Sequence, residues 1–459
     1  MRPAFLYKPR RRSVLARIPA GRRYRFPERF LFGAATSSHQ VEGGDTASDW
    51  WRYERLDGRV RNFFNYPEFA QHWKSDHWRR AEDDVRRMKE ELGLGAYRLS
   101  IEWSRIEPHE GQLDRAALGR YVALCAALRA AGIRPCVTLF HWSSPDWIWD
   151  HAAEQETGWY EPGIVGRFAR FCEAVVPALA PHVDFFCTLN EPNIFLYGGF
   201  SEGLLAPGHR RSDRALLPVL NNLLEAHVRA QAIIKRVRAD AEVGIAHSFG
   251  VFEAASSWNP VEALLAAQVE QQFTWSLLDA CATGTMSYRT RDGGLHRVTV
   301  PGLAGSLDFI GVNYYERAFV RVPALFDLRR LEVLHDHHGD KEIWPREIYT
   351  RGFLEVLEAA GRRYGKPLYV TENGRAHPDD RERAAYLREH LRTLGFALTE
   401  RGLDVRGYFV WSLLDNQEWA HGFRPRLGLF EVDYETGARR LRPSGRAYAE
   451  LLAARAIET

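Results

Sequence analysis

Eight short apolar runs recur along the chain, and longer stretches with helical character separate them. Runs this apolar are typical of strands that are covered on both faces, as in an all-parallel sheet. Because short strands alternate with helices, the pattern predicts one α/β domain, a (β/α)8 TIM barrel with its catalytic loops at the carboxyl ends of the strands. The predicted strands are residues 30–33, 97–101, 136–140, 185–189, 243–246, 309–312, 368–371 and 408–411.

Two of the intervening segments have a clear helical period. One ends at Gly132, just before the third strand. Its apolar residues fall three or four positions apart, at Leu118, Val122, Cys125 and Leu128. The other spans residues 381–401, carries a leucine stripe against a charged face, and has Gly402 as its expected cap.

The length of 459 residues suits one large barrel domain with insertions. We expect that domain at residues 24–459, preceded by a basic amino-terminal arm at residues 1–23. The arm lacks the continuous apolar stretch and the small-residue cleavage site of a secretory signal, so a cytoplasmic location is predicted.

Charge and composition limit the kinds of partner. Lys+Arg total 62 and Asp+Glu total 59, and a net charge of +3 gives no reason to expect nucleic acid or a membrane. No apolar run is long enough to span a bilayer. The five cysteines form no close pair and are predicted to be small buried hydrophobes. Whether the chain forms a homo-oligomer is left open by the sequence.

Two glutamates come directly after predicted strands. Glu191 lies in segment 188–192 behind the fourth strand, and Glu372 lies in segment 371–374 at the end of the seventh. Strand ends of a parallel barrel converge on one face, so the two residues can meet over one pocket. Singly, each glutamate is more often an ionised surface residue. A pair of carboxyl groups beside an anomeric carbon is the minimum equipment for cleaving a glycosidic bond, so the pair predicts a glycoside hydrolase.

Several segments carry a family resemblance that extends from Phe26 to about Tyr448. They are residues 30–43, 97–106, 188–192, 371–374 and 411–419. With them the chain resembles glycoside hydrolase family 1, the beta-glucosidase family. The resemblance implies a retaining beta-glycosidase that removes terminal non-reducing beta-D-glycosyl residues by double displacement. Glucosides are the expected substrates, and galactosidase, fucosidase and mannosidase activities are left open.

The resemblance also implies roles for five residues. Glu191 is expected to act first as acid and then as base, and Glu372 as the nucleophile. Arg98 matches the family arginine that contacts the nucleophile. Tyr315 matches the tyrosine that donates a hydrogen bond to the nucleophile, and Asn313 matches a neighbouring polar contact.

A second set of residues is expected to bind the sugar and its leaving group, with polar groups for the hydroxyls and aromatic faces for the ring. Trp344 is expected on the leaving-group side. Glu418 favours a neutral sugar because a carboxylate would repel a phosphate, although Arg424 and Arg426 leave some doubt. The whole set is Gln40, His141, Asn190, Trp344, Trp411, Glu418, Trp419 and Phe423.

Two single positions and the segment 341–345 depart from the usual family pattern. Ser143 stands where many members have an aspartate, and Glu102 replaces a common serine. The histidine-rich stretch 335–338 is expected to be a solvated tract, and neither a metal nor a cofactor is expected. The expected partner is a small-molecule or oligosaccharide beta-glycoside.

Two alternative functions use the same scaffold. A transglycosylase would pass the same glycosyl-enzyme to a sugar or alcohol instead of water. A catalytically silent carbohydrate-binding protein would keep only the fold, since fold does not determine function, but the presence of both Glu191 and Glu372 argues against it.

Overall fold

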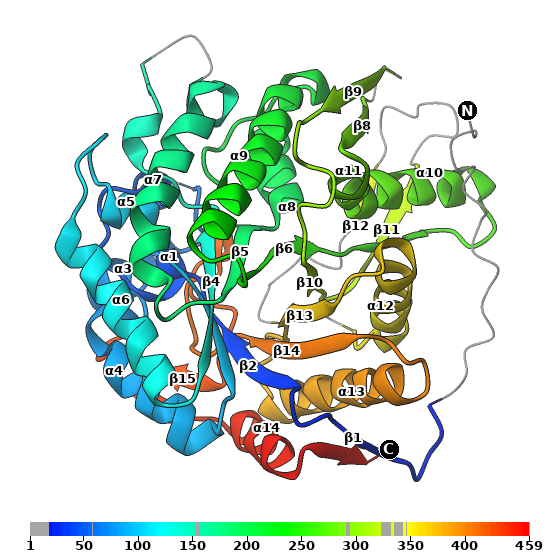
Figure 1. Ribbon diagram of the computed structural model, residues 1–459. Coiled ribbons are helices and arrows are strands. Elements are labelled where there is room, and N and C mark those ends of the chain that lie inside the picture. Colours follow the sequence, from blue (N-terminus) through cyan, green and yellow to red (C-terminus); the bar gives the residue numbers. More distant parts are fainter. Residues whose placement is uncertain are drawn as a thin grey trace.

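A closed barrel of eight parallel strands forms the centre of the molecule (Figure 1). The computed structural model describes residues 18–56, 58–152, 157–290, 294–322, 332–334, 343–345 and 347–458. The barrel strands are β2 (Leu31–Ala35), β3 (Ala96–Ser100), β4 (Arg134–Phe140), β5 (Phe185–Asn190), β6 (Glu242–Ser248), β10 (Phe309–Asn313), β13 (Leu368–Asn373) and β14 (Val405–Trp411). All eight predicted strands are confirmed. The first and last, β2 and β14, pair side by side and close the ring.

Helices between the strands form the outer layer. The longer ones are α4 (His77–Arg87), α6 (Arg115–Ala130), α7 (Gly163–Leu179), α9 (Leu216–Val237), α10 (Pro260–Glu270), α11 (Ser276–Thr283), α12 (Thr350–Tyr364), α13 (Asp380–Thr399) and α14 (Pro443–Ala454). The two predicted helices are confirmed as α6 and α13. Gly132 and Gly402 follow them with φ of 73° and 61°, the left-handed conformation that glycine adopts without strain.

Shorter elements lie in the loops. The helices are α1 (Ser38–Val41), α2 (Asp49–Glu54), α3 (Glu68–Trp73), α5 (Trp103–Ile106) and α8 (Pro192–Leu196). The strands are β1 (Arg23–Arg25), β7 (Val251–Ala254), β8 (Thr285–Arg289), β9 (Leu295–Thr299), β11 (Arg317–Arg321), β12 (Glu332–Leu334), β15 (Phe430–Val432), β16 (Arg439–Leu441) and β17 (Ala456–Glu458).

The amino-terminal end of the barrel interior is filled by aromatic rings. The ring of Phe185 lies 4.9 Å from that of Phe309 and 4.7 Å from that of Tyr369. Gly33 leaves room for the neighbouring Phe409, because a Cβ at this glycine would come within 2.6 Å of that ring. The barrel interior is therefore a packed core at this end.

The two ends of the described chain meet at the barrel's lower side. Strand β1 pairs antiparallel with β17, so Arg23 at the boundary of the predicted arm is the first residue of a strand. Residues 1–17 of that arm and the stretch 335–338 lie outside the described residues. All five cysteines are buried, as predicted. Among the described helices, none is both long enough and apolar enough to cross a membrane. The cytoplasmic location and the domain boundary stay predictions.

Candidate active site

The two predicted catalytic glutamates both lie at the carboxyl end of the barrel. Glu372 is the second-last residue of β13, and Glu191 follows β5 directly. Both are nearly buried, with 4% and 6% of their surface exposed. The amide of Glu191 donates to the carbonyl of Ala246 in the adjacent strand, and Pro192 opens α8 at the position where a missing N–H costs nothing.

Arg98 connects the centre of the site. It projects from β3 and is 1% exposed. Its Nη1 lies 2.5 Å from Glu372 Oε1, and its Nη2 lies 2.6 Å from Asn190 Oδ1. Its Nε donates to Thr138 Oγ1 at 3.1 Å. A buried guanidinium needs acceptors for its N–H groups, and Arg98 finds several here, including the carboxylate of Glu372.

The second oxygen of Glu372 is held by a phenol. Tyr315 donates its O–H to Glu372 Oε2 at 2.7 Å. Burial, and next the charge of Glu372, raise the pKa of Tyr315 well above its ordinary value, so the phenol stays protonated and remains a donor. The ring of Trp344 stacks on that of Tyr315 at 4.5 Å and 29°, which places Trp344 beside the nucleophile candidate.

Glu191 has a different environment. Burial and then the charge of Glu372 raise its pKa to about 8. A hydrogen bond from Asn313 Nδ2 at 2.9 Å opposes this shift only in part. Asn313 is oriented in turn by Thr371, whose Oγ1 donates to Asn313 Oδ1 at 2.6 Å. A pKa of about 8 suits Glu191 to hold a proton at neutral pH, as a general acid must.

Gln40 lies at the side of the site formed by α1 and the loop after β14. Its Nε2 donates to Asn416 Oδ1 at 3.0 Å and to the carbonyl of Gln417 at 2.7 Å. It also lies 3.4 Å from Glu418 Oε2. The indole N–H of Trp411 approaches the same carboxylate oxygen at 3.5 Å. The amide of Gln40 and the carboxylate of Glu418, both predicted to bind sugar hydroxyls, thus lie side by side.

His141 connects this side to the catalytic centre. Its ring lies nearly parallel to those of Trp411 and Trp419, at 5.9 and 6.0 Å. Asn190 Nδ2 donates to His141 Nε2 at 2.9 Å, and burial keeps the pKa of His141 well below its ordinary value. We therefore assign the proton to Nδ1. That nitrogen is buried with no hydrogen-bond partner in the described part of the chain, so it can donate to a ligand hydroxyl.

Phe423 contacts other aromatic side chains. This side chain is fully buried, and its ring packs on Tyr66 and Tyr434, both at 4.9 Å, and on Phe63 at 6.2 Å. The other predicted site residues are joined by the polar and aromatic contacts described above. A role for Phe423 in binding stays a prediction, and the observed contacts of its ring are with these three aromatic side chains.

Several functional contacts come from residues that the sequence analysis missed. Thr138 and Thr371 orient Arg98 and Asn313, and Ser248 forms a side-chain hydrogen bond to Glu191. Thr138 and Thr371 lie inside apolar strands, where a lone hydroxyl is the one available signal of a buried polar partner. Asn416 sits between the named Trp411 and Glu418 and contacts Gln40 directly.

Three residues around the site adopt left-handed backbone conformations. Trp142, Glu191 and Trp419 have φ of 70°, 41° and 48°. Such conformations cost a non-glycine residue about 1–3 kcal/mol and persist where the surrounding structure imposes them. Their presence at three site residues indicates that packing, not local preference, determines the site geometry.

One group of residues has the composition of a metal site. Ligand atoms of His39, Asp45 and Glu102 lie within 4.8 Å of one another. The carboxylate of Glu102 already accepts from Ser38 Oγ at 2.9 Å, and His39 Nε2 lies 2.6 Å from the Lys74 ammonium. A cation next to one ligand disfavours a second cation, so we assign no metal here.

Comparison with known proteins gives consistent matches over nearly the whole chain. The description "Glycosyl hydrolase family 1" matches residues 22–457. Beta-glucosidase 40 of Arabidopsis thaliana is 32% identical, and the alignment covers 90% of each chain. A beta-glycosidase from Pyrococcus horikoshii superposes with a TM-score of 0.82 at 35% identity, over 95% of this chain and 96% of that one. A beta-glucosidase from Thermotoga maritima in complex with glucoimidazole has a TM-score of 0.82 at 30% identity, over 94% and 99%.

Proposed function

The chain belongs to glycosyl hydrolase family 1 and is an O-glycosyl hydrolase of the beta-glucosidase type, and we propose that it works with Glu372 as nucleophile and Glu191 as acid and base. The observation that carries the assignment is the contrast between the two carboxyl groups. Glu372 pairs with Arg98 and Tyr315, whereas Glu191 has its pKa raised to about 8.

In the first step, Glu372 attacks the anomeric carbon and Glu191 gives its proton to the leaving oxygen. The bond to the leaving group breaks, and an ester to Glu372 forms with inversion at the anomeric carbon. Arg98 and Tyr315 favour an ionised and correctly oriented nucleophile before attack. For a retaining mechanism we expect the carboxyl groups of Glu191 and Glu372 to lie about 5 Å apart.

In the second step, Glu191 takes a proton from water, which attacks the same carbon and releases the sugar with net retention. Esterification removes the charge of Glu372, which is one of the two causes of the raised pKa of Glu191. The pKa of Glu191 therefore falls in the intermediate, and the residue becomes a better proton acceptor when it must act as base.

We propose a neutral, unphosphorylated beta-glycoside as substrate, with a glucoside first. Glu418 lies beside Gln40, where its carboxylate would repel a phosphate. Arg426, which could have served a phosphate, is engaged elsewhere. Its Nη1 lies 3.2 Å from Asp415 Oδ2 and 3.1 Å from the carbonyl of Val432.

The test is a panel of nitrophenyl beta-glycosides assayed on purified protein: glucoside, galactoside, fucoside, mannoside, xyloside and 6-phosphoglucoside. We expect turnover of the neutral members and little of the phosphorylated one. Turnover of the phosphorylated substrate alone would overturn the reading of Glu418. Products analysed with and without an added alcohol acceptor distinguish hydrolysis from transglycosylation, because transfer yields an alkyl glycoside.

A further inference from the structure

The loop after β14 presents the polar groups that surround Gln40. Asn416 and the carbonyl of Gln417 accept hydrogen bonds from the Gln40 amide, and Glu418 follows directly in sequence. The relative positions of these groups determine how well they can form hydrogen bonds with sugar hydroxyls. The contacts that hold this loop in place therefore affect substrate binding.

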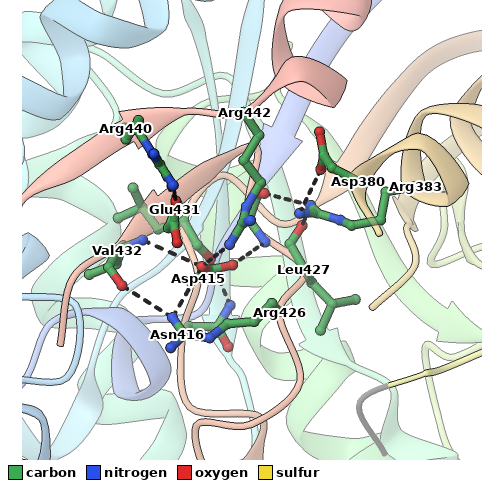
Figure 2. A network of polar contacts seen from close by, with 12 residues as sticks. Asp380, Arg383, Asp415, Asn416, Arg426, Leu427, Glu431, Val432, Arg440 and Arg442 are labelled. Carbon is green, nitrogen blue, oxygen red and sulfur yellow. Dashed lines mark hydrogen bonds and ion pairs between the residues drawn. The ribbon is translucent and has the colours of Figure 1, made fainter. Parts of the chain in front are cut away.

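Asp415, the residue before Asn416, is the anchor of this loop. Figure 2 shows its carboxylate at the centre of a polar network. The side chain is fully buried. Its Oδ1 accepts from the amide of Gly428 at 2.9 Å, and its Oδ2 accepts from the amide of Val432 at 3.4 Å. The carboxylate of Asp415 thus connects the first part of the loop to the later residues Gly428 and Val432.

Two guanidinium groups face the same carboxylate. Arg426 Nη1 lies 3.2 Å from Asp415 Oδ2, and Arg442 Nη2 donates to the same oxygen. A buried carboxylate is tolerated when it is paired and fully hydrogen-bonded, and removing its charge leaves both cations without their partner. The geometry of the loop therefore depends on the charge at Asp415.

The network continues into the outer helices. Arg383 of α13 donates to the carbonyls of Leu427 and Gly428 at 2.7 and 2.5 Å. Asp380, at the start of the same helix, accepts from the amide of Ser444 at 2.6 Å, and Ser444 lies in the first turn of α14. The loop is thereby attached to two helices of the rigid outer layer (Figure 2).

The main chain at Asp415 is held as well. Its amide donates to the carbonyl of Phe430 at 3.0 Å, and its carbonyl accepts from Ser75 Oγ at 2.5 Å. The amide, carbonyl and side chain are all engaged one residue before Asn416. A displacement here is passed directly to Asn416 and Glu418.

We propose that Asp415 is a positioning residue for sugar binding, whose pairing with Arg426 and Arg442 presets the loop for the sugar hydroxyls. This inference rests on the proposed function. A site that is ordered before binding spares the substrate the cost of ordering it, and a displacement of about 1 Å can cost up to about 10²-fold in activity. Asp415 acts through Gln40 and Glu418.

The test is Asp415→Asn, which keeps the shape of the side chain but removes its charge. We expect the KM for 4-nitrophenyl beta-glucoside to rise about tenfold or more, with a much smaller change in kcat per active site. Active sites are counted by trapping with a 2-deoxy-2-fluoroglucoside. A beta-xyloside, which lacks the hydroxymethyl group, should be affected less, so the glucoside-to-xyloside ratio of kcat/KM should fall.

Matched variants separate positioning from folding. Glu431→Gln removes the partner of Arg440 at the exposed edge of the same network and should leave the KM unchanged. Arg426→Met should raise the KM for the glucoside, whereas Arg426→Lys, which keeps a cation near Asp415, should restore it towards the wild-type value. This pair carries the test if Asp415→Asn does not fold.

Two results would overturn the inference. One is a loss of titratable sites with the KM of the remaining sites unchanged, which would make Asp415 a residue of the fold alone. The other is an equal loss on the glucoside and the xyloside. Absence of turnover by the wild-type protein on every glycoside would instead count against the proposed function.

Discussion

Arg98 Nη1 lies 2.5 Å from Glu372 Oε1, and both side chains are buried at the carboxyl end of the barrel. The pair brings together β3 and β13, which are far apart in sequence. Removing either partner of a buried ion pair is costly, because the remaining side chain would be a buried charge without compensation. Arg98 therefore places its charge against the carboxylate of Glu372 and, through Nη2, also donates to Asn190.

Replacing Arg98 tests this dependence. Arg98→Met should lower kcat/KM for aryl glucosides by about 10²–10³-fold, because Glu372 loses the cation that favours its ionised form. Steady-state kinetics per titrated site give the measurement. Arg134→Met is the matched control, because Arg134 pairs with Asp184 and Glu242 at the start of β4, at the opposite end of the barrel. A similar loss in both variants would show a general effect on stability.

Removing the carboxylate of Glu372 should abolish turnover of aryl glycosides. Glu372→Gly leaves a space in which azide can attack the anomeric carbon while the phenolate departs, so azide should restore release and give an alpha-glycosyl azide. Product configuration is read by NMR. Glu372→Gln fills the space and should show no rescue. A folded glycine variant without rescue would remove Glu372 from the nucleophile role.

The acid role of Glu191 predicts a dependence on the leaving group. Glu191→Ala should retain the first step for dinitrophenyl glucosides, whose leaving groups need little protonation, and should slow it strongly for phenyl glucosides. The second step should slow for both, so the glycosyl-enzyme should accumulate and the KM for the dinitrophenyl substrate should fall. Pre-steady-state bursts report this accumulation. Equal losses on the two substrates would argue against the acid role.

The raised pKa of Glu191 predicts the alkaline side of the pH profile. The residue must be protonated for the first step, so kcat/KM for phenyl glucosides should be retained below about pH 8 and fall as the pH rises through that value. The alkaline decline should disappear in Glu191→Ala assayed with a dinitrophenyl glucoside. An unchanged decline in that variant would assign it to another group.

Glu418 should discriminate against charged sugars. Glu418→Ala removes the carboxylate beside Gln40 and should raise the KM for the neutral glucoside, while it reduces the discrimination against 6-phosphoglucoside. The ratio of kcat/KM for the two substrates is the readout. If the ratio stays constant, the carboxylate does not face the sixth position of the sugar.

Much of the site could be predicted because the chemistry lies in short segments. Glu191 and Glu372 end apolar strands, and the barrel pattern places strand ends together. His141 was different, since a core histidine was the better interpretation from its residues alone, and the family resemblance favoured binding. Among the described residues His141 Nδ1 has no hydrogen-bond partner, and the ring lies near two indoles; both observations support the binding role and need coordinates.

Other contacts could not be predicted from the sequence, because they join residues that are distant along the chain. Phe423 is predicted to bind substrate, and the sequence did not indicate that its ring packs among Phe63, Tyr66 and Tyr434. Arg426 left a doubt about phosphate, and the sequence could not indicate that this side chain pairs with Asp415. No periodicity marks such contacts, because a side chain's direction in a loop depends on the surrounding packing.

The sequence by itself determined the eight strands, the helices between them and the two carboxyl groups at strand ends, because these follow from local apolar patterns and short motifs. Only the tertiary structure showed how the surroundings of the two carboxyl groups differ. Burial and the distribution of charge act through space. Glu372 accepts hydrogen bonds from Arg98 and Tyr315, whereas burial and the charge of Glu372 raise the pKa of Glu191, which accepts from the amide of Asn313.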